Sequence, residues 1–111
     1  MHKAGTVILL PFPFTDMSGS KIRPALVVSG STPGEDIVVV FISSKHSNIG
    51  KYDIVVEPSK QNGLKAPSVI KCAKIATLDK KIILGELGRL DSKILTQVKV
   101  RLTKVLELRH D

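Results

Sequence analysis

The sequence is poor in cysteine and in aromatic side chains. Its 111 residues include one cysteine, no tryptophan and only 4% aromatic residues. A single cysteine excludes an intrachain disulfide framework and a cysteine-based zinc site, which favours a cytoplasmic protein. That cysteine, Cys72, lies in an apolar run, where a buried and unreactive thiol is typical. With so few rings, the core must be built from aliphatic side chains.

Long hydrophobic runs are also absent from the sequence. No run is long enough to span a bilayer, so we expect no membrane segment. The basic start and short apolar run of residues 1–11 lack a small-residue cleavage site, so we expect no signal peptide. The length suits one domain, which we place at residues 1–111.

Acidic residues are scarce relative to basic ones. The sequence has ten Asp and Glu residues and 17 Lys and Arg residues, which gives a net charge of +7. A basic surface raises the local concentration of polyanions and speeds their capture. The charge therefore favours a nucleic acid or an acidic protein as partner, with solubility alone as the competing interpretation.

Short runs rich in β-branched and aliphatic residues recur between turn signals, a pattern typical of a sandwich or small barrel. From Asp91 to Leu108 the apolar residues instead recur at helical spacing, with Asp91 as the N-cap. The expected fold class is mainly β (α+β), a small curved β-barrel of five to seven strands with a C-terminal helix. The expected strands are residues 7–10, 25–29, 37–42, 52–56, 68–78 and 82–87, the fifth bending near Lys71–Lys74.

The segment PFPFTDMSGSKIRP, residues 11–24, separates the first two expected strands. Pro11 and Pro13 are expected to end the first strand, because proline cannot donate to a ladder. Pro24 holds Arg23 in an extended conformation where the second strand starts. Loops on rigid sheets commonly carry binding sites, although a merely solubilising turn is the competing interpretation. The candidate substrate-binding residues in this segment are Thr15, Ser18, Ser20 and Lys21.

A second polar cluster follows the third expected strand. If the second and third strands pair as antiparallel neighbours, Arg23 lies beside Ser43. A guanidinium fork next to a hydroxyl suits a phosphodiester. His46 can exchange protons near neutral pH, although an exposed loop histidine is the commoner case. The candidate substrate-binding residues in this cluster are Ser44, Lys45 and His46.

Several catalytic motifs are missing from the sequence. It has no P-loop, no HExxH pattern and no paired carboxylates, and its ten acidic residues are dispersed. We therefore expect neither a metal site nor a cofactor. A phosphodiester enzyme of this kind would act on RNA, because the 2′-hydroxyl supplies an internal nucleophile that DNA lacks.

Three blocks of the sequence resemble the MazF/PemK toxin family. The block GTVILLPFPFTDMSGSKIRPALVVS is followed in order by VVVFISS and SVIKCAKIATLDKKII, and together they cover most of the chain. The resemblance implies an SH3-like barrel, a homodimer and a metal-independent, sequence-selective endoribonuclease (an mRNA interferase) acting on single-stranded RNA. It also implies an antitoxin with a disordered acidic segment, which we expect in the groove beside residues 13–22.

The resemblance also assigns roles to individual residues. The catalytic arginine of the family falls on Arg23, and its catalytic threonine falls on Ser43, which keeps the hydroxyl but loses the β-branch. The acid or amide that family members often carry near Ala73 and Lys74 is missing, which leaves Lys74 as a substrate-binding candidate. Arginine is a poor general base, so Arg23 is assigned to transition-state charge, with His46 as a weak candidate for the proton acceptor.

Two other functions are compatible with the same fold. One is a non-enzymatic toxin that binds gyrase, and the other is an inactive RNA-binding module. Gyrase-binding relatives depend on a helix-end contact rather than on an arginine–hydroxyl pair. Because this chain has both Arg23 and Ser43, the sequence favours the endoribonuclease.

Overall fold

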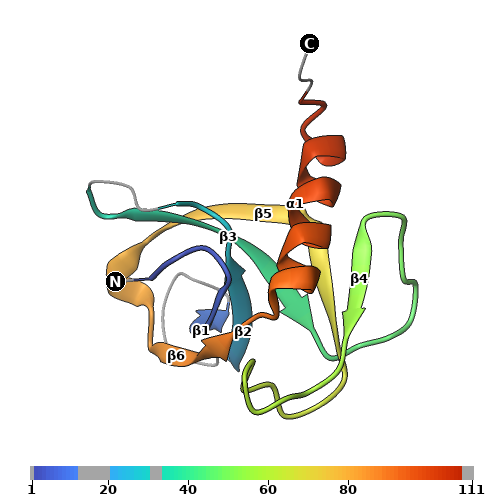
Figure 1. Ribbon diagram of the computed structural model, residues 1–111. Helices are drawn as coiled ribbons and strands as arrows, with labels where there is room; N and C mark the ends of the chain where they lie inside the picture. The colour runs from blue at the N-terminus through green and yellow to red at the C-terminus, as the bar shows by residue number, and fades with distance from the viewer. Residues whose placement is uncertain (1, 13–20, 31–33, 109–111) are drawn as a thin grey trace.

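The computed structural model describes residues 2–12, 21–30 and 34–108. Within these residues the chain forms six β-strands, one 3₁₀ turn and one C-terminal helix (Figure 1). The mainly-β fold class predicted from the sequence is confirmed. The elements are β1 (Thr6–Phe12), β2 (Lys21–Val27), β3 (Asp36–Ser43), β4 (Asp53–Val56), β5 (Ser68–Asp79), η1 (Lys80–Ile82), β6 (Gly85–Arg89) and α1 (Ser92–Val105).

The six strands form one curled antiparallel sheet, a half-barrel. Their order across the sheet is β4-β5-β3-β2-β1-β6, so β3 lies between β2 and β5. The long strand β5 bends around the molecule and reaches both β3 and β4 (Figure 1). This curvature lets residues from β2, β3 and β5 face one another across a concave surface.

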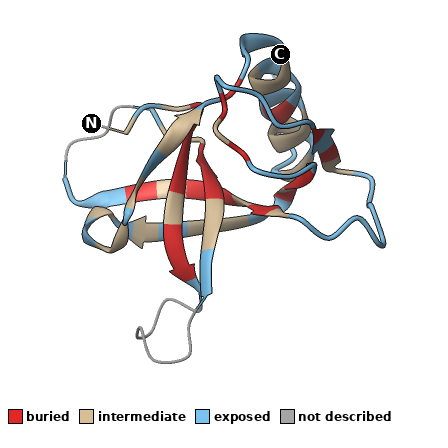
Figure 2. Cartoon of the chain, turned by 90° about the horizontal axis from the view of Figure 1, so that it is seen from below, coloured by how far each residue is buried: buried red, intermediate tan, exposed pale blue. Residues whose placement is uncertain are grey.

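Both faces of the central strands are buried, as Figure 2 shows for the middle of the sheet. Val39 and Val40 are neighbours on β3, yet they belong to two different core clusters. Val40 packs in the cluster that includes Val98 of α1, whereas Val39 packs in the cluster within the curl. Successive strand residues point to opposite faces, so burial on both faces explains the unbroken apolar runs.

The single cysteine belongs to the cluster beneath α1. Cys72 is fully buried. Burial raises the pKa of its thiol to about 11, even though the nearby Arg101 charge acts in the opposite direction. The predicted burial of this residue is confirmed, and its thiol stays protonated at neutral pH.

The C-terminal helix begins as predicted but ends earlier. The Asp91 carboxylate accepts a hydrogen bond of 2.7 Å from the backbone N–H of Lys93 and caps α1. The helix stops at Val105 rather than at Leu108, because Glu107 takes a positive φ of 54° that a helix does not allow. Within the described residues, no helix combines the length and apolarity needed to cross a membrane.

The first strand does not end at Pro11, contrary to the prediction. β1 continues to Phe12, and Pro11 lies opposite Ile22 of β2. On its other side, β1 pairs with β6 only from Thr6 to Leu9. Proline is tolerated beyond the end of a ladder, where its missing N–H leaves no bond unmade. Pro13 lies outside the described residues.

The predicted strand over residues 82–87 is displaced toward the C-terminus. Residues Lys80–Ile82 form η1, which the Asp79 carboxylate caps by accepting a bond of 2.8 Å from Lys81 N–H. β6 therefore begins only at Gly85. The sequence showed the apolar residues of this segment but not the cap that turns the chain first.

We expect Gly63→Ala to destabilise the fold. Gly63 has a φ of +72°, and an added Cβ would lie 2.3 Å from the carbonyl oxygen of Leu87 in β6. The left-handed backbone alone should cost about 1–2 kcal/mol, before the clash is counted. Urea unfolding would measure this against Gly30→Ala, where a Cβ meets no atom within 4 Å. Equal stability of the two variants would contradict the prediction.

Candidate functional site

A pocket of about 390 Å³ opens where the start of β2 and the end of β3 meet the bend in β5. The two residues predicted to be catalytic, Arg23 and Ser43, both line it, and so does Lys74. The described lining residues are Phe12, Arg23, Phe41, Ile42, Ser43, Lys71, Lys74 and Ile75.

Strand register explains why Arg23 and Ser43 line the same pocket. β2 and β3 pair antiparallel, and Ala25 lies opposite Phe41. Extending this register by two residues places Arg23 opposite Ser43. Residues two apart share a face of a strand, so Ser43 lies on the same face as Phe41, which also lines the pocket. The antiparallel pairing predicted for these strands is confirmed.

The guanidinium of Arg23 is held against an aromatic ring. Its Cζ atom lies 5.6 Å from the ring centroid of Phe12, within cation–π range. Phe12 in turn meets Phe41 edge to face, with centroids 5.9 Å apart. The Nε atom of Arg23 is buried, and no acceptor among the described residues bonds it. A buried donor without a partner calls for an explanation, and an anionic ligand in the pocket would supply the acceptor.

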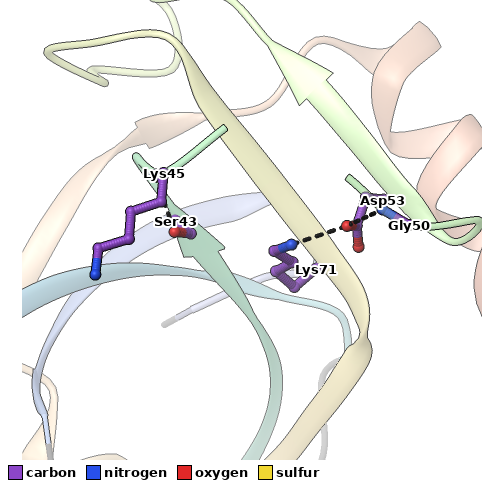
Figure 3. A network of polar contacts seen from close by, with 5 residues as sticks. All are labelled: Ser43, Lys45, Gly50, Asp53 and Lys71. Carbon is purple, nitrogen blue, oxygen red and sulfur yellow. Dashed lines mark hydrogen bonds and ion pairs between the residues drawn. The ribbon is translucent and has the colours of Figure 1, made fainter. Parts of the chain in front are cut away.

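Ser43 is positioned by the turn that follows β3. Its Oγ atom accepts a hydrogen bond of 3.1 Å from the backbone N–H of Lys45 (Figure 3). This bond uses an oxygen lone pair and not the hydroxyl hydrogen. The O–H of Ser43 therefore keeps its capacity to donate to a ligand, and Lys45 contributes to the site through its backbone.

The bend in β5 brings two lysines to the pocket. Val40 of β3 pairs with Ile75, but the next residue, Phe41, pairs with Lys71, so residues 72–74 have no opposite partner on β3. In a regular strand Lys71 and Lys74 would point to opposite faces, because they are an odd number of residues apart. The irregularity turns the strand, and both side chains line the pocket.

Lys71 is fixed by a carboxylate from the neighbouring strand. It lies opposite Asp53 of β4, and its Nζ atom donates to Asp53 Oδ2 at 2.9 Å (Figure 3). The same oxygen accepts a bond of 2.7 Å from the backbone N–H of Gly50. Burial alone would raise the pKa of Asp53, but the Gly50 bond and the charges of Lys71 and Lys74 outweigh it and lower the pKa.

Three of the predicted substrate-binding residues, Ser44, Lys45 and His46, are not among the described residues that line this pocket. Ser44 lines a second, smaller pocket of about 250 Å³, whose walls include Leu9, Leu64 and Leu87. His46 is not among the described lining residues, and its Nε2 atom donates to the carbonyl oxygen of Pro67 at 2.8 Å. Holding that bond requires the proton on Nε2, so this nitrogen is not a free proton acceptor.

The remaining predicted residues come from the segment of residues 11–24. Lys21 is exposed at the start of β2, opposite Phe12. Thr15, Ser18 and Ser20 lie outside the described residues. The structure thus brings together Arg23, Ser43 and Lys74 from the predicted set.

Sequence reasoning missed Phe12, Phe41, Lys71 and Asp53. The two phenylalanines lie in apolar runs and look like ordinary core residues. Lys71 and Lys74 have a spacing that a regular strand would place on opposite faces. The expected bend near these lysines was the available signal, but sequence alone did not show which way it turns them.

The donor set of the pocket suits an anion rather than a metal ion. Across residues 2–12, 21–30 and 34–108, no group of three or more His, Cys, Asp and Glu side chains could hold a metal. The pocket instead gathers a guanidinium, two ammonium groups and a hydroxyl. Such groups are typical of phosphate recognition.

We expect Asp53→Asn to lower the free energy of unfolding at pH 7 by about 1.5–3 kcal/mol, because a charged acceptor of two hydrogen bonds is lost. The folded-state pKa of Asp53 is lowered, so its contribution is complete above the usual value of 3.8 and declines as the pH falls through the folded-state pKa. The difference from wild type should therefore shrink below about pH 3.8. Urea unfolding across pH, with the exposed Glu57→Gln as control, would measure it. A difference that does not change with pH would contradict the ion-pair explanation.

Comparison with known proteins places the chain in a family. The model of the PemK-like, MazF-like toxins of type II toxin–antitoxin systems matches residues 3–106. No curated protein matches the chain.

Several solved structures share the fold. An endoribonuclease in complex with its cognate antitoxin, from a mycobacterial species, has a TM-score of 0.78 at 20% identity, covering 98% of each chain. The MazE–MazF complex (Form-III) from Deinococcus radiodurans has a TM-score of 0.77 at 22% identity, covering 96% of this chain and 97% of its own. The Mycobacterium tuberculosis toxin MazF-mt6 has a TM-score of 0.75 at 17% identity, covering 95% and 99%. With the match over residues 3–106, the chain belongs to the PemK-like, MazF-like toxins of type II toxin–antitoxin systems.

Proposed function

We propose that this toxin is a metal-independent, sequence-selective endoribonuclease that cuts single-stranded RNA. The observation that carries the proposal is the pocket that Arg23 and Ser43 both line, in which the buried Nε of Arg23 has no hydrogen-bond acceptor among the described residues. The net charge of +7 suits a polyanionic substrate. Membership of the family supports the same function, as do fold relatives that are described as endoribonucleases.

The scissile phosphate would bind between Arg23 and Ser43. The 2′-hydroxyl of the RNA gives its proton to water as its oxygen attacks phosphorus, the bond to the 5′-oxygen breaks, and that oxygen takes a proton from water, so a cyclic phosphate and a free 5′-hydroxyl result. Negative charge grows on the phosphoryl oxygens in the transition state. The guanidinium, held over Phe12, and the Ser43 O–H would stabilise that charge without rearranging, which is how preorganised donors accelerate reactions.

The composition of the pocket also bears on which groups take part in proton transfer. No carboxylate or imidazole is present among its described lining residues. The Nε2–H of His46 donates a hydrogen bond to the backbone carbonyl oxygen of Pro67. Catalysis in this proposal therefore depends on charge stabilisation and on orienting the RNA, rather than on a histidine base.

We further propose a cytoplasmic homodimer that an acidic antitoxin neutralises. Two of the fold relatives are complexes with an antitoxin or with MazE. A disordered acidic segment would complement the basic chain and fold as it binds. Its expected site, the groove beside residues 13–22, is next in sequence to Arg23, which lines the pocket proposed to bind phosphate, so we expect antitoxin and RNA to compete.

Replacing Arg23 tests the function. If Arg23 holds the transition state, both Arg23→Lys and Arg23→Ala should slow single-turnover cleavage of a defined RNA about a hundred- to a thousandfold. Lysine should fail because an ammonium cannot reproduce the planar two-point fork. RNA affinity and the melting temperature should change little. Lys60→Ala, an exposed residue outside the pocket, is the control.

The outcomes separate the competing functions. If Arg23→Lys cleaves RNA at a rate within a few-fold of wild type, Arg23 contributes only its positive charge. A wild-type protein that binds RNA but leaves it intact would be an inactive RNA-binding module. A protein that neither binds nor cuts RNA but associates with gyrase would be the non-enzymatic toxin.

Cleavage should persist in excess EDTA. The described residues offer no group of three or more His, Cys, Asp and Glu side chains that could hold a metal ion. The measurement is the cleavage rate with and without EDTA, and a magnesium-dependent nuclease in the same buffer serves as the positive control for chelation. Activity that disappears with EDTA and returns with magnesium would overturn the proposed mechanism.

A further inference from the structure

The β5 side of the pocket differs chemically from the Arg23 side. The polar side-chain groups that β5 contributes there are the ammonium groups of Lys71 and Lys74, which can only donate hydrogen bonds. Phe41 and Ile75 supply apolar wall beside them. This part of the pocket therefore offers two donors and a flat apolar surface to whatever binds next to the phosphate.

We propose that this part of the pocket selects a guanine base adjacent to the scissile phosphate, an inference that rests on the proposed endoribonuclease function. Guanine presents two adjacent acceptors, O6 and N7, on one edge, and lysine or arginine is their usual partner. Adenine and cytosine place an amino group on the corresponding edge, where it would face an ammonium. In single-stranded RNA these edges are accessible.

Lys71 is suited to hydrogen bonding rather than to attracting phosphate. Its charge is balanced by Asp53 at 2.9 Å, and its side chain is only 18% exposed. The pair uses one of the three ammonium protons, which leaves two for a ligand. Because Asp53 fixes the chain, little rotamer freedom is lost when a base binds. Arg23, by contrast, forms no ion pair with any described residue and is left for the phosphate.

Lys74 is the residue that decides between bases. It is exposed at the mouth of the pocket and lies near enough to Asp53 to lower the pKa of that carboxyl. The carboxylate of Asp53 is already bonded to Lys71 and Gly50 and is not among the described lining residues. Among the described lining residues, therefore, no carboxylate is available to accept a hydrogen bond from the amino group of adenine or cytosine.

The apolar walls would hold the face of the base. Stacking on aromatic side chains tolerates any base, so it contributes affinity without choosing. A volume of about 390 Å³ lies in the range of pockets that bind small organic molecules. Selection among bases is left to the lysines, with Lys71 held in place by Asp53 and Lys74 deciding between bases.

Binding of uncleavable RNA would test this directly. Fluorescently labelled 2′-O-methyl pentamers AAXAA, with X as guanine, adenine, cytosine or uracil, cannot be cut and report affinity alone. The guanine pentamer should bind about five- to a hundredfold more tightly than the others. Replacing guanine with 7-deazaguanine removes N7 and should abolish most of that preference.

Variants at Lys74 would assign the preference. Lys74→Glu replaces a donor with an acceptor, so the preference should shift from guanine to cytosine or adenine, whose amino groups can donate. Lys60→Glu makes the same charge change outside the pocket and should weaken all four pentamers equally. Melting temperatures would check that both variants fold.

The two proposals can fail separately. Equal affinity for the four pentamers, or a guanine preference that survives Lys74→Glu, would overturn the base assignment even if the protein cuts RNA. A guanine preference that depends on Lys74, in a protein that leaves RNA intact, would support the base assignment and overturn the endoribonuclease.

Discussion

The antiparallel pairing of β3 with β2 on one side and β5 on the other is the constraint on which the site depends. The β2 ladder, extended by two residues, places Arg23 opposite Ser43. The β5 ladder places Lys71 opposite Phe41 and shifts register at Val40. One strand therefore sets the position of the residues proposed to bind phosphate and of those proposed to bind a base. A one-residue slip of β3 would reverse the face of every side chain on it, including Ser43.

Charge is distributed unevenly around that pocket. Lys71 is paired with Asp53, and this pair is only 18% and 10% exposed at its two side chains. Partial burial strengthens the pair, but it also removes the charge of Lys71 from the electrostatic attraction of a polyanion. Arg23 has no such carboxylate partner among the described residues. In the proposed function, this arrangement separates the long-range attraction of phosphate by Arg23 from the short-range donation of hydrogen bonds by Lys71.

Burial of the sheet on both faces explains why the strands could be predicted from the sequence, whereas their ends could not. Strands buried on both faces appear as continuous apolar runs, so their existence was readily predicted from Val and Ile content. Their ends were harder, because they depend on polar contacts between distant residues. Pro11 continues β1 because β6 stops pairing at Leu9, and β6 starts late because Asp79 caps a turn. Neither feature produces a periodic pattern of residues in the sequence.

The sequence by itself determined the fold class, the helix cap at Asp91, the burial of Cys72 and the meeting of Arg23 with Ser43. These follow from local preferences and from the pairing of strands that are neighbours in the chain. Only the tertiary structure decided that Lys71 and Lys74 share a pocket, that Asp53 neutralises one of them, and that His46 is bonded to Pro67. Each of those facts depends on how β4 and β5 pair and bend after they meet, and the free energy of such long-range contacts is not encoded in any short stretch of residues.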